Sequence, residues 1–213
     1  GLDSCFEDFD NPIALFKNWF SKAEEKEIND PNAVAVATSD KDNQPNVRMV
    51  LLKGLSDRGF VFYTNFNSKK GGELKINQKA SMCFHWKSLR RQVRVLGKVE
   101  EVTSKEADDY YNSRPYKNRI SAWASSQSQT LDKRETFLDK IKEFEKKYPE
   151  EKNVPRPPHW SGWRLMPDEI EFWVDGEGRV HERLKYKSTN SKWNKEILLS
   201  LIHISEPTRL GFI

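Results

Sequence analysis

Apolar and polar residues alternate over much of the chain with the two-residue period that is typical of half-buried strands. This pattern predicts eight or nine short strands, at residues 33–37, 46–53, 59–64, 81–86, 91–102, 163–166, 169–174, 179–187 and 193–198. Helical spacing or capping residues predict helices that begin after Asn11, Ser68 and Thr103, and others over 120–125 and 131–148. This order of elements argues against a doubly wound parallel sheet. It favours a closed antiparallel barrel, mainly β, with peripheral helices.

The charge balance and the apolar runs limit what the protein can bind. Lys and Arg number 36 against 32 Asp and Glu, and a net charge of +4 is too small to indicate a nucleic-acid partner. The longest wholly apolar run, residues 33–37, is far shorter than the roughly 18 residues that span a bilayer. Two cysteines, Cys5 and Cys83, are too few for a zinc site or a disulfide framework. We therefore expect a globular protein with no nucleic acid, no membrane and no metal as partner.

The two ends of the chain carry separate expectations. Residues 1–12 are acidic and lack the basic and apolar regions of a signal peptide, so we expect a cytoplasmic protein, and the initial Gly indicates a fragment or a processed form. Residues 199–209, LSLIHISEPTR, resemble the translation of a common sequencing-library adapter. We therefore expect a single domain over residues 1–198 and a non-native tail over residues 199–213.

The strongest local pattern is a row of cationic residues in one predicted strand. Arg179, His181 and Arg183 occupy alternate positions, so their side chains project from the same face, whereas Val180 and Leu184 point toward the core. Like charges on one face repel each other unless an anion or carboxylates lie opposite. One interpretation is a solvated face with local Glu partners, and the other is a row of cations that binds an anion.

Two further segments carry candidate cations. Arg48 and Lys53 stand at the two ends of an apolar strand, which is consistent with strand ends that reach a polar pocket. Lys69 and Lys70 stand at a helix start, where free backbone N–H groups favour a phosphate. Each pair taken alone is also consistent with ordinary solvated positions.

Polar residues on a strand face and on a helix face complete the candidates. Gln92 and Arg94 share the outer face of one strand, and Gln can both donate to and accept from the edge of a heterocycle. Tyr110 and Arg114 are four residues apart on a helix. The sequence contains no recognisable nucleophile and base set, no metal-ligand cluster and no GxGxxG or P-loop, so a nucleotide would not be held in the Rossmann manner.

Taken together, these segments resemble the pyridoxine (pyridoxamine) 5′-phosphate oxidase family over residues 11–193. The motifs that carry the resemblance are RMVLLKG (48–54), FYTNFNSKKGGEL (62–74), RRQVRV (90–95), YYNSRP (110–115), WASSQS (123–128) and EFWVDGEGRVHER (171–183). The resemblance implies an antiparallel, Greek-key split β-barrel and a homodimer with flavin mononucleotide (FMN) at the subunit interface. It also implies oxidation of pyridoxine or pyridoxamine 5′-phosphate to pyridoxal 5′-phosphate, with O2 reduced to H2O2.

The resemblance assigns roles to individual residues as well. The implied flavin-binding residues are Arg48, Met49, Val50, Leu51, Tyr63, Thr64, Lys69, Lys70, Gln92, Gln127, Ser128, Trp173 and Arg183, some of them from the partner subunit. The implied substrate-binding residues are Lys53, Tyr110, Arg114, Asn118, Arg179 and His181, and the implied catalytic residues are Arg179 and His181. Asn118 stands where the family usually has Ser, so an altered affinity for the substrate phosphate is expected.

Two other functions are compatible with the same motifs. One is another split-barrel FMN-dependent reductase with a nicotinamide donor, and the other is a non-catalytic carrier of flavin or pyridoxal phosphate. The Tyr110/Arg114 and Arg179/His181 pairs argue against the reductase because they suit a small phosphorylated ring. Turnover with O2 would separate the oxidase from the carrier.

Overall fold

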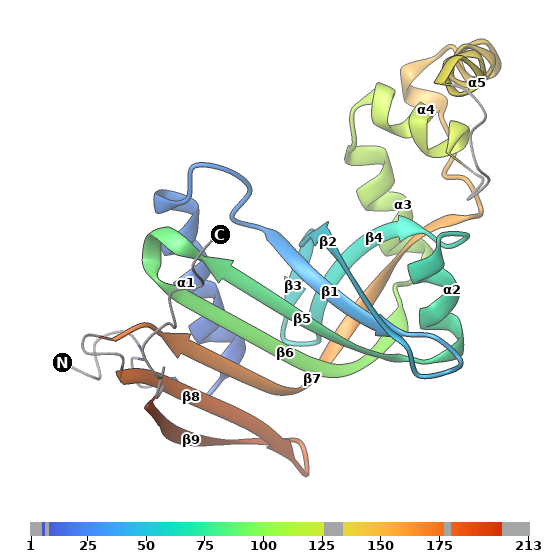
Figure 1. Cartoon of the computed structure of the whole chain (residues 1–213). Coiled ribbons are helices and arrows are strands. Elements are labelled where there is room, and N and C mark those ends of the chain that lie inside the picture. Colours follow the sequence, from blue (N-terminus) through green and yellow to red (C-terminus); the bar gives the residue numbers. More distant parts are fainter. Residues whose placement is uncertain (1–5, 7–8, 126–133, 177–179, 202–213) are drawn as a thin grey trace, which may run out of the picture.

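The computed structural model describes residues 6, 9–125, 134–176 and 180–201 (Figure 1). Its helices are α1 (Pro12–Lys26), α2 (Lys69–Ile76), α3 (Ser104–Ser113), α4 (Tyr116–Ala124) and α5 (Arg134–Lys147). Its strands are β1 (Ala33–Ser39), β2 (Pro45–Leu51), β3 (Gly54–Ser56), β4 (Gly59–Asn65), β5 (Lys79–Trp86), β6 (Arg91–Glu101), β7 (Trp160–Val174), β8 (Val180–Thr189) and β9 (Lys192–Leu201). Most of the predicted elements are therefore present, and β3 is an addition.

The strands form one antiparallel sheet in the order β2-β1-β5-β6-β7-β4-β3, with β8 beside β7 and β9 beside β8. Strand β2 leads into β3 through Leu52 and Lys53. The Leu52 amide donates to the Asn32 carbonyl next to β1, whereas the Lys53 amide donates to the Val61 carbonyl of β4. Two consecutive residues thus join the two ends of the sheet, which curls back on itself. The predicted antiparallel split barrel with peripheral helices is confirmed.

Aromatic rings fill the space between α1 and the sheet. Asn11 caps α1 as predicted, and its side-chain oxygen accepts from the Ile13 amide at 2.9 Å. Phe16 packs against Phe84 of β5 with 4.9 Å between ring centroids, and Trp19 packs against Phe172 of β7 at 5.1 Å. All four rings are buried. Burial of each such side chain contributes roughly 1.5–3 kcal/mol, so this cluster anchors α1 to the barrel.

Strand β7 is fifteen residues long and connects the barrel to the β8–β9 hairpin. The sequence predicts two strands here because Pro167 interrupts the pattern, but the structure has one. The register between the two strands shifts at Leu96 and Gly97 of β6, opposite which Asp168 is an extra residue of β7, and this β-bulge absorbs the interruption. Gly97 is required there, since a Cβ would lie 2.0 Å from the Met166 carbonyl oxygen.

Helices α3, α4 and α5 form a lobe next to the start of β7 (Figure 1). The predicted capping box is present, with Thr103 and Glu106 each accepting from the other's backbone N–H. Helix α4 begins at Tyr116, earlier than predicted. Helix α5 is amphipathic and contacts α4, where Phe144 stacks on Trp123 at 5.6 Å, although none of its residues is fully buried.

The described residues include no helix that is both long and apolar enough to cross a bilayer. At the C-terminal end, β9 continues to Leu201, three residues into the expected tail. Residues 202–213 lie outside the described part of the chain.

Candidate active site

The predicted cations Lys69 and Lys70 lie in the first turn of α2. Ser68 caps this helix, and its hydroxyl accepts from the Gly71 amide at 3.1 Å. Gly71 allows the helix to approach the preceding turn, since a Cβ there would lie 2.6 Å from the Phe66 carbonyl oxygen. Free N–H groups and two lysines at a helix start have the chemistry of a phosphate site.

Arg48 of β2 adds a third cation next to Lys70. Its guanidinium donates to the Val36 carbonyl at 3.1 Å and to the Thr38 hydroxyl at 2.6 Å. Burial, and to a smaller extent the neighbouring charge of Arg48, lowers the pKa of Lys70 to about 8. Two cations therefore face each other in a half-buried place, and a bound phosphate would relieve their repulsion.

The buried carboxylate of Glu73 holds this cluster in place. It accepts from the Thr38 hydroxyl at 2.5 Å and from the Asn46 amide at 2.7 Å, and it pairs with Arg48 at 3.5 Å. Sequence reasoning missed Glu73 because a Glu in a Lys-rich helix has the pattern of a solvated residue. Its partners lie on β1 and β2, between 25 and 35 residues earlier in the chain.

A stack of aromatic rings lies between β4, α3 and the start of β7. The Tyr63 ring is 4.1 Å from that of Tyr110 and 5.2 Å from that of Trp160. The Arg114 guanidinium lies over Trp160, 5.0 Å from the ring centroid, and burial lowers the pKa of Arg114. The predicted Tyr110 and Arg114 are thus brought together. Trp160 was missed, since nothing in its local pattern marks it.

The remaining predicted residues of this region lie around the same end of β4. Thr64 is buried next to Tyr63, and Lys53 is exposed at the bend between β2 and β3. The exposed Asn118 lies on α4, where its carbonyl accepts from the Arg114 guanidinium at 3.5 Å. We call Arg48, Lys70, Tyr63, Tyr110 and Arg114 the α2 group.

A second set of predicted residues lies at the opposite end of β7. Trp173 pairs in the sheet with Gln92 of β6 on one side and with Arg183 of β8 on the other. Its ring stacks on that of His181 at 4.7 Å, and His181 is 7% exposed. We call Gln92, Trp173, His181 and Arg183 the β8 group. The predicted Arg179, Gln127 and Ser128 lie outside the described residues.

Carboxylates of β7 form ion pairs with the cations of β8. The Arg183 Nε donates to the Glu171 carboxylate at 2.6 Å. Burial raises the pKa of Glu171, but the hydrogen bond and the charge of Arg183 outweigh burial and hold that pKa below its ordinary value. The same hydrogen bond raises the pKa of Arg183. Arg183 thus has a Glu partner within one chain, and the role of the row of cations in binding an anion stays a prediction.

The α2 group and the β8 group are far apart in one chain. Tyr63 pairs with Gly162 near the start of β7, whereas Gln92 and Arg183 pair with Trp173 near its end. Gly162 and Trp173 are eleven positions apart in β7, a path of roughly 35 Å along a strand. Figure 1 shows α2 and α3 at one end of this strand and β8 at the other. One chain therefore does not bring the two groups into a single small-molecule site.

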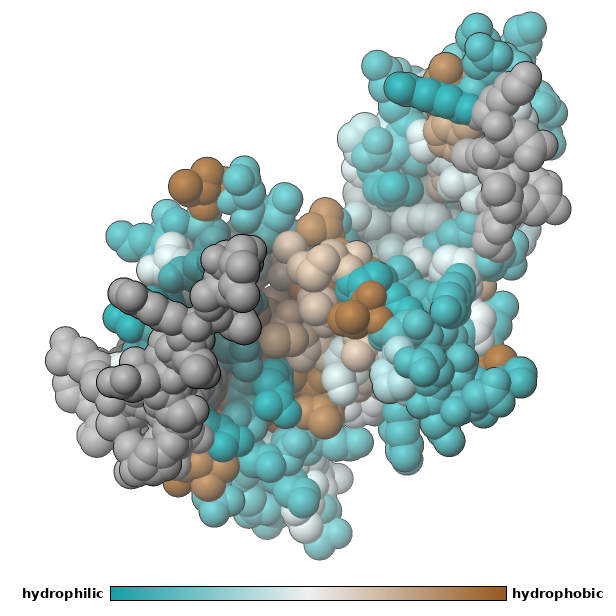
Figure 2. Space-filling model, viewed as in Figure 1, coloured by the Kyte–Doolittle hydropathy of each residue, from teal (hydrophilic) through white to brown (hydrophobic). Residues whose placement is uncertain are grey.

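The outer face of β2 is apolar and exposed. Val47 is 69% exposed, Met49 64% and Leu51 40%, whereas Val50 packs into the core. Figure 2 shows apolar atoms gathered over β1 and β2 in the middle of the molecule. This face adjoins the α2 group because Val47 and Met49 flank Arg48 in β2, and Met49 and Leu51 are also predicted flavin residues.

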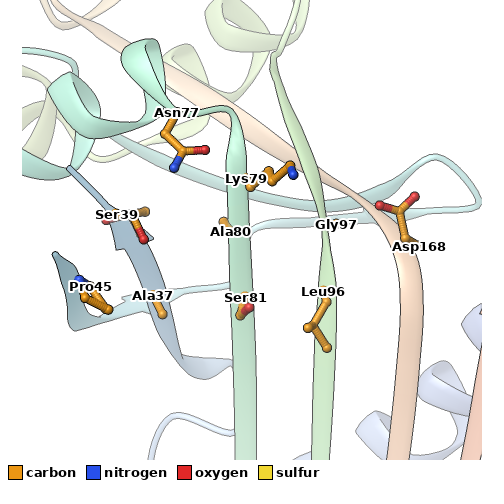
Figure 3. Close-up of a pocket in the computed structure, with 11 residues that line it drawn as sticks. Ala37, Ser39, Pro45, Asn77, Lys79, Ala80, Ser81, Leu96, Gly97 and Asp168 are labelled. Atoms are coloured by element: carbon orange, nitrogen blue, oxygen red, sulfur yellow. The ribbon is translucent and has the colours of Figure 1, made fainter. Parts of the chain in front are cut away.

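The described surface also has a hollow of about 480 Å³ over β1, β5 and β6 (Figure 3). Lys79 and Asp168 are its charged lining residues. It contains none of the predicted site residues, and no group of three metal-binding side chains occurs among the described residues. The hollow therefore lies outside the candidate site.

Two family models match the chain. The model described as "Pyridoxamine 5'-phosphate oxidase" matches residues 20–148, and that described as "Pyridoxine 5'-phosphate oxidase C-terminal dimerisation region" matches residues 160–200. A Pelagibacter ubique protein named pyridoxine/pyridoxamine 5'-phosphate oxidase is 58% identical over 199 residues, covering 93% of this chain and 96% of that protein. A protein of the same name from Agrobacterium fabrum is 53% identical over 198 residues, covering 92% and 96%.

Solved structures agree with the fold. PhzG from Burkholderia lata, in complex with tetrahydrophenazine-1-carboxylic acid, superposes with a TM-score of 0.85 at 30% identity, covering 92% of this chain and 96% of that chain. A pyridoxamine 5'-phosphate oxidase-related, FMN-binding protein from Nostoc punctiforme gives a TM-score of 0.70 at 15% identity, covering 86% and 96%. The second likeness supports the fold alone.

Proposed function

This chain belongs to the pyridoxamine 5′-phosphate oxidase family, and from that membership we propose how its two residue groups perform the reaction. The enzyme oxidises pyridoxine or pyridoxamine 5′-phosphate to pyridoxal 5′-phosphate. Two electrons and two protons leave the substrate and reduce O2 to H2O2, and the amine substrate also takes up water and releases ammonia. The observation that carries the proposal is the separation of the α2 group from the β8 group along β7.

We propose FMN as the cofactor, and the cation cluster at α2 fits its phosphate. Lys70 and Arg48 face each other in a half-buried place, where burial and, to a smaller extent, the charge of Arg48 lower the pKa of Lys70. A phosphate between them and the α2 N-terminus would be stabilised by charge-assisted hydrogen bonds. When bound, the flavin ring supplies two-electron chemistry, accepting a hydride from the substrate and passing electrons to O2.

The aromatic stack is the proposed site of the substrate phosphate. Arg114 is held over Trp160, and Tyr110 stacks on Tyr63, so both side chains are fixed before the substrate arrives. Asn118, whose carbonyl accepts from Arg114, and the exposed Lys53 are proposed to add donors. Preordered donors lower the entropy cost of binding and hold the substrate ring in one orientation.

The β8 group is proposed to act on the substrate ring and on the flavin. Arg183 and Gln92 would bind the flavin, and Trp173 would pack beside it. His181, together with Arg179, would orient the substrate and assist its proton loss. Because the α2 group and the β8 group of one chain lie at opposite ends of β7, each complete site needs two copies of the chain.

We therefore propose a homodimer in which the α2 group of one copy meets the β8 group of the other. A two-fold axis then creates two equal sites. The exposed apolar face of β2 adjoins the α2 group and would be covered by the second copy. The match of residues 160–200 to a dimerisation region supports this arrangement. We also expect the enzyme to work in the cytoplasm.

Affinity for FMN should fall as the pH rises through about 8. Lys70 is charged below its pKa of about 8 and neutral above it, and its charged form is the one that stabilises a phosphate. From about pH 7 to about pH 9, the dissociation constant of FMN should rise roughly tenfold. The measurement is a fluorescence titration of the apoprotein at both values.

Two controls isolate the lysine. Lys70→Arg keeps its charge over this range and should lose most of the dependence. Riboflavin, which lacks the phosphate, should bind equally at both values. A tenfold change that persists in Lys70→Arg would contradict the role of Lys70.

Oxygen uptake tests the proposed function. Protein reconstituted with FMN should show the absorbance of a bound flavin, and should consume O2 when pyridoxamine 5′-phosphate is added, forming pyridoxal 5′-phosphate. Binding of flavin without oxygen uptake would favour a carrier. Turnover that requires a nicotinamide donor would favour a reductase.

A further inference from the structure

The carboxylate of Asp175 lies between His181 and Arg90. One oxygen, Oδ1, is 3.0 Å from the His181 Nδ1. The other oxygen, Oδ2, accepts from the Arg90 Nε at 2.9 Å and from the Arg90 Nη2 at 2.5 Å. Each oxygen of the carboxylate therefore has its own cationic or ionisable partner.

The backbone fixes the position of this carboxylate. Arg91 and Val174 are paired at the end of the β6–β7 ladder, and the Asp175 amide extends the ladder by donating to the Arg90 carbonyl at 2.9 Å. Arg90 adopts a left-handed conformation, with φ of 55°, at the turn that precedes β6. Asp175 is thus anchored by both its backbone and its side chain.

The imidazole of His181 is confined from two directions. Trp173 stacks on the ring with an interplanar angle of 26°. The Nδ1 atom is shielded from solvent, and Asp175 is at hydrogen-bonding distance from it, although the carboxylate lies off the direction of an ideal N–H bond. A small rotation of the ring would align the two, as hydrogen bonds at active sites often align when substrate binds.

We propose that Asp175 is a positioning residue that keeps a proton on Nδ1 of His181 and leaves the Nε2 lone pair free. A carboxylate accepts hydrogen bonds and donates none, so the nitrogen facing it carries the proton in the neutral ring. Arg90 holds the carboxylate in the required orientation. The inference rests on the proposed role of His181 at the substrate. In that role, the free Nε2 is the atom that accepts a hydrogen bond or a proton from the substrate.

The Asp175→Asn variant inverts the expected tautomer for a definite reason. Arg90 only donates hydrogen bonds, so the amide oxygen of Asn would face Arg90 and its NH2 group would face His181. Nδ1 must then accept, and the proton moves to Nε2. Adding Arg90→Met removes this constraint, because Met has no donor and the amide can turn its oxygen back to His181.

Nitrogen-15 NMR of protein labelled at histidine measures the tautomer directly. The chain has four histidines, so the spectrum is simple. His159 provides an internal reference for the opposite tautomer, since its Nε2 lies 2.8 Å from the Ala122 carbonyl oxygen and must donate to it. At a pH where the rings are neutral, His181 should carry its proton on Nδ1 in the wild type, on Nε2 in Asp175→Asn, and again on Nδ1 in Arg90→Met/Asp175→Asn.

Kinetics supply a second readout. Asp175→Asn should lower kcat/KM by roughly tenfold to a hundredfold, the range seen when a carboxylate that orients a metal-bound His is lost, while the dissociation constant of FMN stays unchanged. Asp42→Asn, the same charge change on an exposed turn beside Lys41, serves as the matched control and should match the wild type.

The outcomes separate this inference from the proposed function. A wild-type His181 with its proton on Nε2, or a tautomer that is the same in wild type and Asp175→Asn, would overturn the role of Asp175 even if turnover is normal. The wild-type spectrum decides by itself if the variant fails to fold. Absence of turnover with the expected tautomers would instead contradict the proposed function.

Discussion

Arg183→Ala should raise the dissociation constant of FMN by roughly a hundredfold. The change removes the proposed charge-assisted contact with the flavin, and it also removes the partner of Glu171. The Arg183 guanidinium bonds to Glu171 at 2.6 Å, and Glu171 is 6% exposed. Without Arg183, this buried carboxylate loses its hydrogen-bond donor, so the end of β7 that carries Trp173 is destabilised as well. A flavin fluorescence titration measures the affinity.

Lys185→Ala is the matched control for this variant. Lys185 lies two residues further along β8, on the same face, and pairs with Glu169 at 2.9 Å. Its removal should leave FMN affinity within a factor of about two, since Lys185 pairs with Glu169 and belongs to neither residue group. Unchanged FMN affinity in Arg183→Ala would contradict the role given to Arg183.

The Glu171 pair also sets a direction for acid stability. The folded-state pKa of Glu171 is held below its ordinary value, so the pair stabilises the folded chain at neutral pH. That contribution is lost as the pH falls through the lowered pKa. The loss of flavin caused by Arg183→Ala should therefore be judged at neutral pH, where the native pair is intact.

Arg114→Ala should lower kcat/KM for pyridoxamine 5′-phosphate by roughly a hundredfold or more, mainly through KM. Truncation of one partner of a partly buried charged hydrogen bond costs about 2–5 kcal/mol, and Arg114 is the cation that Trp160 and Tyr110 hold in place. FMN affinity should be unchanged, because the cations proposed to face the flavin phosphate are Arg48 and Lys70 rather than Arg114. Steady-state kinetics and a flavin titration separate these two effects.

Pyridoxamine, the substrate without its phosphate, shows whether the loss of activity in Arg114→Ala comes from lost phosphate binding. Activity on pyridoxamine should be weak in the wild type and should fall little further in Arg114→Ala. Lys117→Ala, which removes an exposed cation from the adjacent helix α4, should behave as wild type. An equal loss on the phosphorylated and the unphosphorylated substrate would mean that Arg114 does not bind the phosphate.

The parts of the fold that the sequence predicts well are those fixed by short-range chemistry. Asn11 before Pro12 and the Thr103–Glu106 capping box specify helix starts within four residues. The single strand β7 was missed because its continuity across Pro167 depends on pairing with Gly97 of β6, seventy residues earlier, and on a bulge at Asp168. Strand β3 was missed for a similar reason, since the bend at Leu52 and Lys53 depends on pairing with two different strands.

In the site, too, short-range patterns were predictable from the sequence, whereas contacts across the fold were not. Cations could be predicted from alternation and from helix capping, but the particular residues that contact each of them could not. Glu73, Trp160 and Asp175 resemble solvated or core residues in their local segments. Each acquires its role from contacts across the fold, such as Trp160 with Tyr63 and Arg114. The separation of the two residue groups also required the sheet register, which the sequence alone did not supply.

The central claim is that each site combines the α2 group of one copy with the β8 group of another, and subunit complementation tests it most directly. Arg114→Ala and Arg183→Ala chains, each with its own affinity tag, would be co-expressed and the mixed dimer purified by both tags. Such a dimer has one site with both changes and one site with neither, so it should regain about half of the wild-type activity. If the mixed dimer is as inactive as the two parental variants, each site is built within a single chain and the account is wrong.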